Sequence, residues 1–510
     1  MMTGESKTGV MLGELLSGWL VVPERENCWI KSITQDSRTV RQGSLFLACS
    51  GGSHHGLDFF NQAVDAGAVA VVCEPALEWP LERIEMLTES LEIPLLVVDG
   101  LGIKLSALAG RFYHHPSQSM TVVGVTGTNG KTSCAQFLAR ALSDDRPCGV
   151  IGTLGNGFPD SMEDATHTTP DPVLLQALLH ALYAQGAKAV AMEVSSHALD
   201  QSRVAHLNFD VAVLTNLSRD HLDYHGTLAA YGEAKKQLFY MPGLGCAVIN
   251  LDDPFGRELL NELPTDIKRV GYGIGSAVAE GADVDCWVQA PAIDSSSEGM
   301  RITIGGSWGE GTLNTPLLGH FNVSNLLAVL AVLLHLDIPL NEALERLAKL
   351  RTVPGRVERF GGGDRPLVVV DYAHTPNALE HVLMALRGHT EQRLICLFGC
   401  GGDRDRGKRP LMGRVAERLA DRVIVTDDNP RGENGDRIVE EILAGMELPE
   451  QVQVIRNRKQ SIAQAIAEAE VGDLVLVAGK GHETVQIVGS EKHPFSDCEQ
   501  VVAALSEVRG

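Results

Sequence analysis

A glycine-rich stretch, residues 121–133, contains the residue types that bind phosphate. Three valines predict a buried strand, residues 127–130 predict a tight loop, and an apolar pattern at spacings of three and four starts a helix at Lys131. In such an arrangement the loop amides and the helix N-terminus face the anion, Lys131 adds a positive charge, and the Thr132 hydroxyl can hold magnesium. Val125 stands where the strict motif has glycine, so this is a variant loop. The alternative, a glycine turn with a surface lysine, is disfavoured by the flanking strand and helix.

Two later strand ends carry candidate metal ligands. Glu193 ends the predicted strand 188–194, and an acid in that position near a phosphate loop can take magnesium. The alternative interpretation is that Glu193 is a solvated residue at the end of the strand and binds no metal. The predicted strand 210–216 leads into 218–226, which is dense in ligand-type residues; the alternative there is a helix start capped by Asp220.

The last third of the chain predicts a doubly wound parallel sheet, because strand candidates alternate with helical patterns. The strand candidates are 367–371, 394–400, 422–427 and 473–478. Each ends in polar or glycine-rich sequence, and in such sheets the ligand crevice lies at the carboxyl ends of the strands. Arg404 and Arg431 could each grip a carboxylate through two hydrogen bonds, and Glu483 could accept an ammonium. The four turns together suit an amino acid with several charged ends better than four ordinary loops.

Length and charge restrict the classes of protein that fit. A chain of 510 residues is too long for one core and suggests three domains, 1–118, 119–355 and 356–510. The net charge of −22 argues against a general nucleic-acid or membrane-surface role. Ten scattered cysteines fit a reducing cytosol. We see no signal peptide and no apolar run long enough for a membrane span.

Each of three polar sites in the sequence allows two interpretations. Ser37 and Arg38 could bind a ligand, but a loop with a structural Asp36–Arg38 pair is favoured. His54 and its neighbouring histidine favour a surface loop over a metal site, because no carboxylate or cysteine stands beside them at ligand spacing. Asn322 could reach a purine edge or cap the helix that follows.

The chain resembles the Mur ligases of peptidoglycan synthesis over nearly its whole length. The motifs that carry the resemblance are Gly127-Thr128-Asn129-Gly130-Lys131-Thr132, Glu193 to Leu199, Asp220 to Gly226, Asp371-Tyr372-Ala373-His374 and Gly479-Lys480-Gly481-His482-Glu483. The resemblance implies an α/β protein of three domains: a small α/β UDP-substrate domain, a central phosphate-loop ATPase domain with a parallel sheet, and a Rossmann-like domain for the amino acid.

The resemblance also implies residue roles. It implies catalytic roles for Lys131, Glu193, His221 and Lys235, and magnesium contacts, at two ions, from Thr132, Glu193, His221 and a Lys235 carboxylated by carbon dioxide. ATP contacts would be Gly127, Thr128, Asn129, Gly130, Lys131, Thr132, Ser133, Asn322, Arg356 and Asp371. The UDP-substrate contacts would be Ser37, His54, Thr168, Thr169, Ser195, Gln201 and Arg203. The diaminopimelate contacts would be Arg404, Asp428, Asn429, Pro430, Arg431, Gly479 and Glu483. His167 stands where an asparagine is expected.

The activity implied by the resemblance is ATP-dependent amide formation. Asp428 to Arg431 spell the Asp-Asn-Pro-Arg stretch that marks users of meso-diaminopimelate, so the implied product is UDP-muramoyl tripeptide made by a cytoplasmic monomer. Alternatives are a lysine-adding relative and a folylpolyglutamate-type ligase. From other classes, a phosphate-loop switch or motor ATPase and an inactive scaffold remain as alternatives.

Overall fold

A computed structural model describes residues 9–52, 54–88, 92–275 and 281–507. The chain forms two compact units. The first comprises Met1–Ile249 and Asp253–Arg269, and the second comprises Asn250–Asp252 and Val270–Gly510. The domain boundaries after residues 118 and 355 stay a prediction.

The first unit begins with a four-stranded parallel sheet in the order β3-β4-β5-β6. Alternate residues of its strands point to opposite faces, and both faces are buried: Leu45 and Leu47 lie in one apolar cluster, Phe46 and Ala48 in another. The elements are β1 Val10–Met11, α1 Leu12–Leu15, β2 Trp29–Ile30, β3 Ser32–Thr34, β4 Ser44–Ala48, α2 Phe60–Asp65, β5 Ala68–Cys73, α3 Leu81–Thr88, β6 Leu95–Val97 and α4 Leu101–Phe112.

The larger sheet of the first unit has its strands in the order β10-β9-β8-β11-β7-β12-β13. Strands β8, β11, β7, β12 and β13 are parallel, and β9 and β10 add an antiparallel hairpin. The elements are β7 Thr121–Thr126, α5 Lys131–Leu142, β8 Cys148–Gly152, β9 Gly155–Phe158, β10 Ser161–Glu163, α6 Pro172–Ala184, β11 Ala189–Glu193, α7 Ser196–Asp200, β12 Val211–Leu214, α8 Leu222–His225, α9 Leu228–Lys236, β13 Cys246–Asn250 and α10 Pro254–Glu262.

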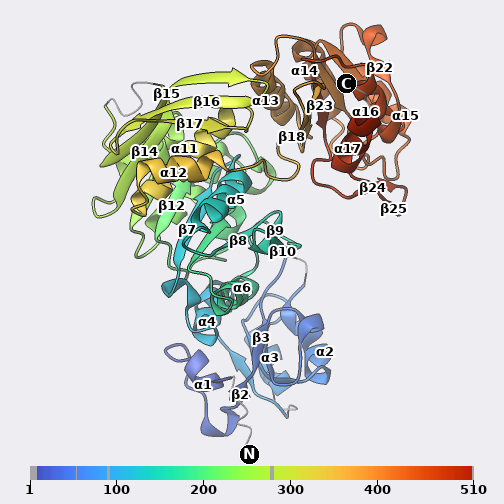
Figure 1. The fold of residues 1–510 in the computed structure, drawn as a ribbon. Coiled ribbons are helices and arrows are strands. Elements are labelled where there is room, and N and C mark those ends of the chain that lie inside the picture. Colours follow the sequence, from blue (N-terminus) through green and yellow to red (C-terminus); the bar gives the residue numbers. More distant parts are fainter. Residues whose placement is uncertain (1–8, 53, 89–91, 276–280, 508–510) are drawn as a thin grey trace, which may run out of the picture. The chain divides into compact units, whose positions relative to one another are not determined.

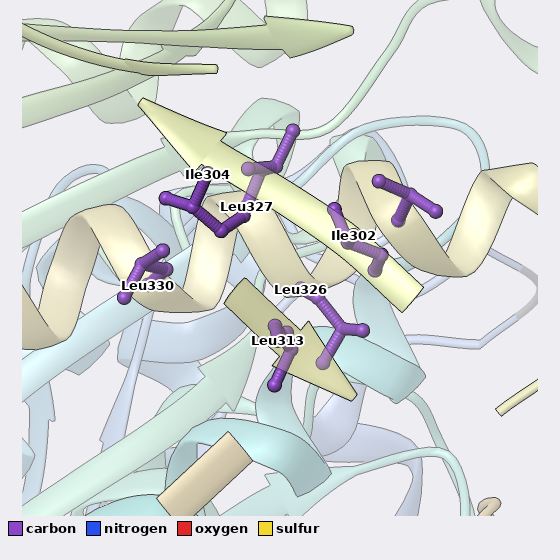
Figure 2. Close-up of a pocket in the computed structure, with 7 residues that line it drawn as sticks. Ile302, Ile304, Leu313, Leu326, Leu327 and Leu330 are labelled. Atoms are coloured by element: carbon purple, nitrogen blue, oxygen red, sulfur yellow. The ribbon is translucent and has the colours of Figure 1, made fainter. Parts of the chain in front are cut away.

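The second unit begins with a mixed sheet covered by an apolar helix: β14 is parallel to β15, whereas β15, β16 and β17 are antiparallel. Its elements are β14 Lys268–Ile274, β15 Cys286–Ser296, β16 Gly299–Gly306, β17 Gly311–Thr315, α11 His320–His335 and α12 Leu340–Ala348. Figure 2 shows leucines of α11 facing β16 and β17 around a small gap. The gap is lined by Ile302, Ile304, Leu313, Val323, Leu326, Leu327 and Leu330. It offers a polar ligand no hydrogen bond. Within the described residues, no helix is both long and apolar enough to cross a membrane.

The second unit ends in a six-stranded sheet in the order β18-β19-β23-β20-β21-β22 (Figure 1). All its pairs are parallel except β18 with β19. Both faces are buried: α13, α14 and α15 contribute to one apolar cluster, α16 and α17 to the other. The predicted doubly wound parallel sheet is therefore confirmed. The elements are β18 Glu358–Gly361, β19 Leu367–Asp371, α13 Pro376–Arg387, β20 Leu394–Phe398, α14 Lys408–Leu419, β21 Arg422–Val425, α15 Gly435–Leu443, β22 Gln453–Val454, α16 Arg458–Ala467, β23 Leu474–Ala478, β24 Val485–Val488, β25 Glu491–Pro494 and α17 Asp497–Glu507.

A buried ion pair joins the starts of α16 and α17 beneath this sheet's carboxyl edge. Arg458 donates Nε and one terminal nitrogen to the two carboxylate oxygens of Asp497, each at 2.7 Å, and both side chains are fully buried. The same guanidinium donates to the carbonyl of Ala478, the last residue of β23, at 3.0 Å. The pair therefore holds a strand end that leads into a predicted binding turn.

Replacing Asp497 by alanine should destabilise the protein strongly, because it leaves a buried guanidinium without its counter-charge. We expect a loss of about 3–5 kcal/mol in the free energy of unfolding, measured by urea denaturation and circular dichroism. The control is Glu380→Ala, which breaks the exposed pair with Arg418 and should cost no more than about 1 kcal/mol. Equal losses in the two variants would contradict this role.

Candidate active site

The loop after β7 has the conformation that its glycines predict. Gly127 and Gly130 have φ of +145° and +87°, in the region that favours glycine. A side chain at Gly127 would also collide with the hydroxyl of Thr215. Helix α5 begins at Lys131, directly after the loop. The predicted order of strand, glycine loop and helix is confirmed.

Lys131 and Thr132 face the loop and the neighbouring strand. The Lys131 ammonium donates to the carbonyls of Gly127 and Thr128, both at 2.9 Å. The Thr132 hydroxyl donates to Glu193 Oε2 at 2.9 Å. An ammonium, a hydroxyl and a carboxylate therefore gather at the N-terminus of α5, where an anion is favoured by the helix dipole.

Glu193 ends β11, opposite Val125 of β7, and is only 2% exposed. Besides Thr132, it accepts from the backbone N–H of Thr153 at 2.7 Å and from its hydroxyl at 3.3 Å. The solvated strand end considered above is therefore wrong. Buried carboxylate oxygens beside a phosphate loop are ligands that Mg²⁺ uses together with phosphate oxygens and water.

A chain of hydrogen bonds connects Glu193 to other predicted residues. The Thr169 hydroxyl donates to the Glu193 carbonyl at 2.8 Å and accepts from the Ser195 N–H at 3.1 Å. Arg203 donates to the Thr169 carbonyl at 2.8 Å and to Gln201 at 3.0 Å. Thr168 is joined through its hydroxyl to that of Thr153, at 3.0 Å. Five of the seven residues predicted for the UDP-substrate thus belong to one hydrogen-bonded chain that reaches Glu193.

The other two residues of that set lie in the small N-terminal sheet region. Ser37 is buried and donates to Gln62 at 3.1 Å. The structural Asp36–Arg38 pair is confirmed, with nitrogen and oxygen 2.7 Å apart. His54 is exposed, and its Nδ1 lies 3.8 Å from a carboxylate oxygen of Asp58.

Lys235 lies under the glycine loop. It is 1% exposed, donates to the Gly127 carbonyl at 2.8 Å, and has its ammonium 4.3 Å from the centre of the Tyr231 ring. Burial lowers the pKa of Lys235 well below its usual range, and the nearby charge of Lys131 lowers it further, against the opposing effect of Asp220. A lowered pKa increases the fraction of the neutral amine, which is the nucleophilic form of the side chain.

His221 is exposed and precedes α8 in a left-handed conformation, with φ of +51°. Its ring lies 5.0 Å from that of His197, and its Nε2 lies 3.5 Å from Asp220. Asp220 was considered as the cap of this helix, and that reading is wrong. Its carboxylate accepts from the adjacent His221 N–H at 2.9 Å, and the left-handed His221 occupies the N-cap position without a side-chain cap.

Three predicted ATP contacts belong to the second unit. Asn322 donates to the carbonyl of Leu318 at 2.8 Å and accepts from the side-chain amide of Asn325 at 3.2 Å. It does not cap α11, which has no side-chain cap. Asp371 ends β19 and accepts from the N–H groups of Val357 and Ala373, both at 2.8 Å. Burial raises the pKa of Asp371, partly offset by the charge of Arg356.

The four polar turns of the last sheet converge as predicted. Strands β19, β23, β20 and β21 are adjacent and parallel, so their carboxyl ends share one edge. Arg431 donates to the Gly402 carbonyl at 2.9 Å, which joins the turn after β21 to the turn after β20. Gly479, with φ of +121°, brings the turn after β23 close to the Asp428 carboxylate.

Within this edge the predicted amino-acid contacts differ in burial. Asp428, Asn429 and Pro430 are buried, Arg431 and Glu483 are half-buried, and Arg404 is exposed. Burial raises the pKa of Asp428. Burial also acts to raise the pKa of Glu483, but the hydrogen bond and charge of Lys480 hold it below its ordinary value. Glu483 is thus a carboxylate at neutral pH.

Sequence reasoning missed Thr153, Tyr231 and Lys480. Thr153 directly follows β8, so its position after a strand was an available signal. Tyr231 was read as part of an amphipathic helix, and nothing local indicates that its ring lies against Lys235. Lys480 stood inside a recognised motif, but its burial depends on the tertiary structure. In the described part of the chain, no cluster of three or more His, Cys, Asp or Glu forms a metal site by itself.

Known proteins resemble this chain over its whole length. Three family models match: the Mur ligase family catalytic domain at 29–99, the Mur ligase middle domain at 125–333, and the Mur ligase glutamate ligase domain at 355–481. A UDP-N-acetylmuramoyl-L-alanyl-D-glutamate–2,6-diaminopimelate ligase of Ectopseudomonas mendocina is 52% identical over 94% of this chain and 95% of its own. The corresponding ligase of Alkalilimnicola ehrlichii is 49% identical over 98% and 99%.

A solved structure supports the same assignment. A UDP-N-acetylmuramoyl-L-alanyl-D-glutamate–2,6-diaminopimelate ligase structure aligns with a TM-score of 0.72 and 34% identity, covering 98% of this chain and 99% of that one. The matched stretches include the glycine loop, Glu193, three turns of the last sheet and the start of the fourth, up to Gly481. Because domain matches, sequence identity and fold agree along the chain, the protein belongs to the Mur ligase family.

Proposed function

We propose that this chain is the ATP-dependent ligase that joins meso-diaminopimelate to the D-glutamyl γ-carboxylate of UDP-N-acetylmuramoyl-L-alanyl-D-glutamate. The observation that carries the proposal is the combination of 52% identity to a ligase of that name with the intact cluster of Lys131, Thr132 and Glu193. Ten cysteines, none of them in a disulfide within the described residues, favour a reducing cytosol. We propose a monomer.

The chemistry must activate a carboxylate, because oxide is a poor leaving group. A carboxylate oxygen attacks the γ-phosphorus of ATP, the bond to the bridging oxygen of ADP breaks, and an acyl phosphate forms. The amine of diaminopimelate then attacks the acyl carbon, a proton is lost, and phosphate leaves. Catalysis of this kind consists mainly of positioning and neutralisation of charge.

The residues of the first unit suit the phosphoryl step. The Lys131 ammonium can turn from the loop carbonyls to phosphate oxygens, while the loop amides and the start of α5 attract the same anion. Thr132 and Glu193 would hold magnesium, which supplies charge neutralisation at the phosphates. We assign His221 to a second magnesium. Thr168, Thr169, Ser195, Gln201 and Arg203 are proposed to bind the UDP-substrate near Glu193, with Ser37 and His54 as further contacts.

Residues of the second unit are proposed to bind ATP and the amino acid. Asn322, Arg356 and Asp371 are assigned to ATP. Arg404 and Arg431 are assigned to carboxylates of the amino acid, and Glu483 to an ammonium. Asp428, Asn429, Pro430 and Gly479 shape the same pocket.

Lys235 is proposed to carry a carbamate. Its neutral amine would attack carbon dioxide and release a proton, which converts a buried cation into an anion able to bind magnesium. The lowered pKa and the burial of Lys235 support this assignment, because only the neutral amine reacts.

The substrate assignment predicts that ADP release depends on the amino acid. With ATP and UDP-muramoyl dipeptide, meso-diaminopimelate should stimulate ADP release, and lysine should do so far less because it lacks the second carboxylate. A coupled ADP assay with each amino acid measures this. Stimulation by lysine alone would indicate a lysine-adding relative, stimulation by folate and glutamate a folylpolyglutamate-type ligase, and full turnover without an amino acid a switch or motor ATPase.

The variant Arg431→Lys should raise the KM for meso-diaminopimelate about tenfold, since an ammonium cannot make two parallel hydrogen bonds to one carboxylate. Steady-state kinetics at saturating ATP measure it. The control is Arg437→Lys, an exposed arginine of α15, which should leave KM unchanged. Unchanged kinetics in Arg431→Lys would refute its assignment.

Carboxylation of Lys235 predicts a carbamate signal in ¹³C NMR when the protein is equilibrated with ¹³C-labelled bicarbonate. The signal should disappear in Lys235→Arg. It should persist in Lys236→Arg, because Lys236 is held as a cation by Glu233, Glu258 and Glu262. A signal that survives in Lys235→Arg, or is absent from the wild type, would contradict the carbamate.

A further inference from the structure

A fully buried lysine lies within the proposed amino-acid pocket. Lys480 follows β23 and has 0% of its side chain exposed. Its ammonium donates to Asn429 Oδ1 at 3.0 Å and to Glu483 Oε2 at 2.8 Å. Burying an ammonium is costly unless it is paired and hydrogen-bonded, so this lysine is held by these two partners.

Asn429 closes a triangle with the same two residues. Its amide nitrogen donates to Glu483 Oε2 at 2.9 Å, and its Oδ1 also accepts from the backbone N–H of Ile487 at 2.9 Å. The two donors on Oδ1 determine which way the amide faces. The orientation of Asn429 therefore depends on Lys480.

The triangle leaves one oxygen of Glu483 available. Oε2 accepts two hydrogen bonds, whereas Oε1 has no hydrogen-bond partner among the described residues. The Glu483 side chain is 29% exposed. A ligand with an ammonium can reach this carboxylate through Oε1.

We propose that Lys480 is a positioning residue that holds Asn429 and Glu483 so that Glu483 Oε1 receives the ammonium of the amino acid distant from the reacting amine. This inference rests on the proposed function. The enzyme would then distinguish amino acids with a second ammonium from those without one, and it would do so with the help of a lysine that does not touch the substrate.

The charges around Glu483 explain why a lysine is needed. Glu483 interacts electrostatically with five titratable groups nearby: Lys480, His482, Arg458, Asp428 and Tyr372. Burial favours protonation of Glu483. Lys480 counters this effect through a direct hydrogen bond and its charge, and holds the pKa of Glu483 below its ordinary value.

The experiment compares meso-diaminopimelate with 2-aminopimelate, which has the same carbon chain and carboxylates but one amine fewer. The KM of the first and the competitive inhibition constant of the second are measured for wild type, Lys480→Met and the control Lys492→Met, an exposed lysine of β25. In Lys480→Met we expect the preference for meso-diaminopimelate to fall about tenfold, with kcat changed less. The control should keep the wild-type preference.

The pH dependence gives a readout that a purely structural role would not move. Without Lys480 the pKa of Glu483 rises, so the carboxylate is lost as pH falls. We therefore expect the KM for meso-diaminopimelate to increase as the pH is lowered from 8, and this increase to begin at a higher pH in Lys480→Met than in wild type. The inhibition constant of 2-aminopimelate should follow wild type over the same range.

Several outcomes would overturn the inference. If Lys480→Met raises the KM for meso-diaminopimelate and the inhibition constant of 2-aminopimelate equally at every pH, Lys480 has a structural role only. If neither constant changes, Lys480 has no role in this selectivity. If circular dichroism shows that Lys480→Met does not fold, Glu483→Gln carries the test: it should lose the same preference, and an unchanged preference refutes the proposal. Absence of diaminopimelate-dependent ADP release in the wild type overturns this inference together with the proposed function.

Discussion

The parallel pairing of β11 with β7 is the constraint on which the phosphate-loop site depends. It places Glu193 opposite Val125, one strand away from the glycine loop. Thr132 and Thr153 can then donate to one buried carboxylate, and Thr169 can bind its backbone carbonyl. A shift of this pairing by one residue would turn Glu193 to the other face of the sheet.

Cations held by oxygen atoms offset a strongly acidic protein at the places where anionic substrates are proposed to bind. The net charge is −22, yet the half-buried Lys131 lies at the glycine loop and the buried Lys480 lies at the edge of the last sheet. Each is held by carbonyl, amide or carboxylate oxygens. Because water is excluded there, a single positive charge acts more strongly than on the surface.

Local sequence was sufficient to predict the elements and the strand ends that carry polar residues. Strand, loop and helix around Lys131 follow from apolar periodicity and glycine, and β19 was predicted with the bounds it has. The convergence of the four last turns followed from the rule that parallel strands share their carboxyl edge. The resemblance to a known family, and not spacing, singled out Lys235 and the UDP-substrate residues.

Local sequence could not predict which polar side chains are buried or which strands lie side by side in the sheet. Lysines are usually exposed, so nothing near Lys480 indicated a fully buried ammonium. Thr153 reaches Glu193 because β8 lies beside β11, an adjacency that spacing does not encode. The alternative in which Asp220 caps a helix is wrong because His221 adopts a left-handed conformation, and that conformation depends on tertiary packing.

The central claim is that the site transfers the γ-phosphoryl group of ATP to a carboxylate before the amide forms. The most direct test uses UDP-muramoyl dipeptide labelled with ¹⁸O in its γ-carboxylate and follows the label by mass spectrometry after one turnover with meso-diaminopimelate. An acyl phosphate requires one ¹⁸O atom in the released inorganic phosphate, with ADP as the other product. Unlabelled phosphate, or label in AMP, would contradict the account.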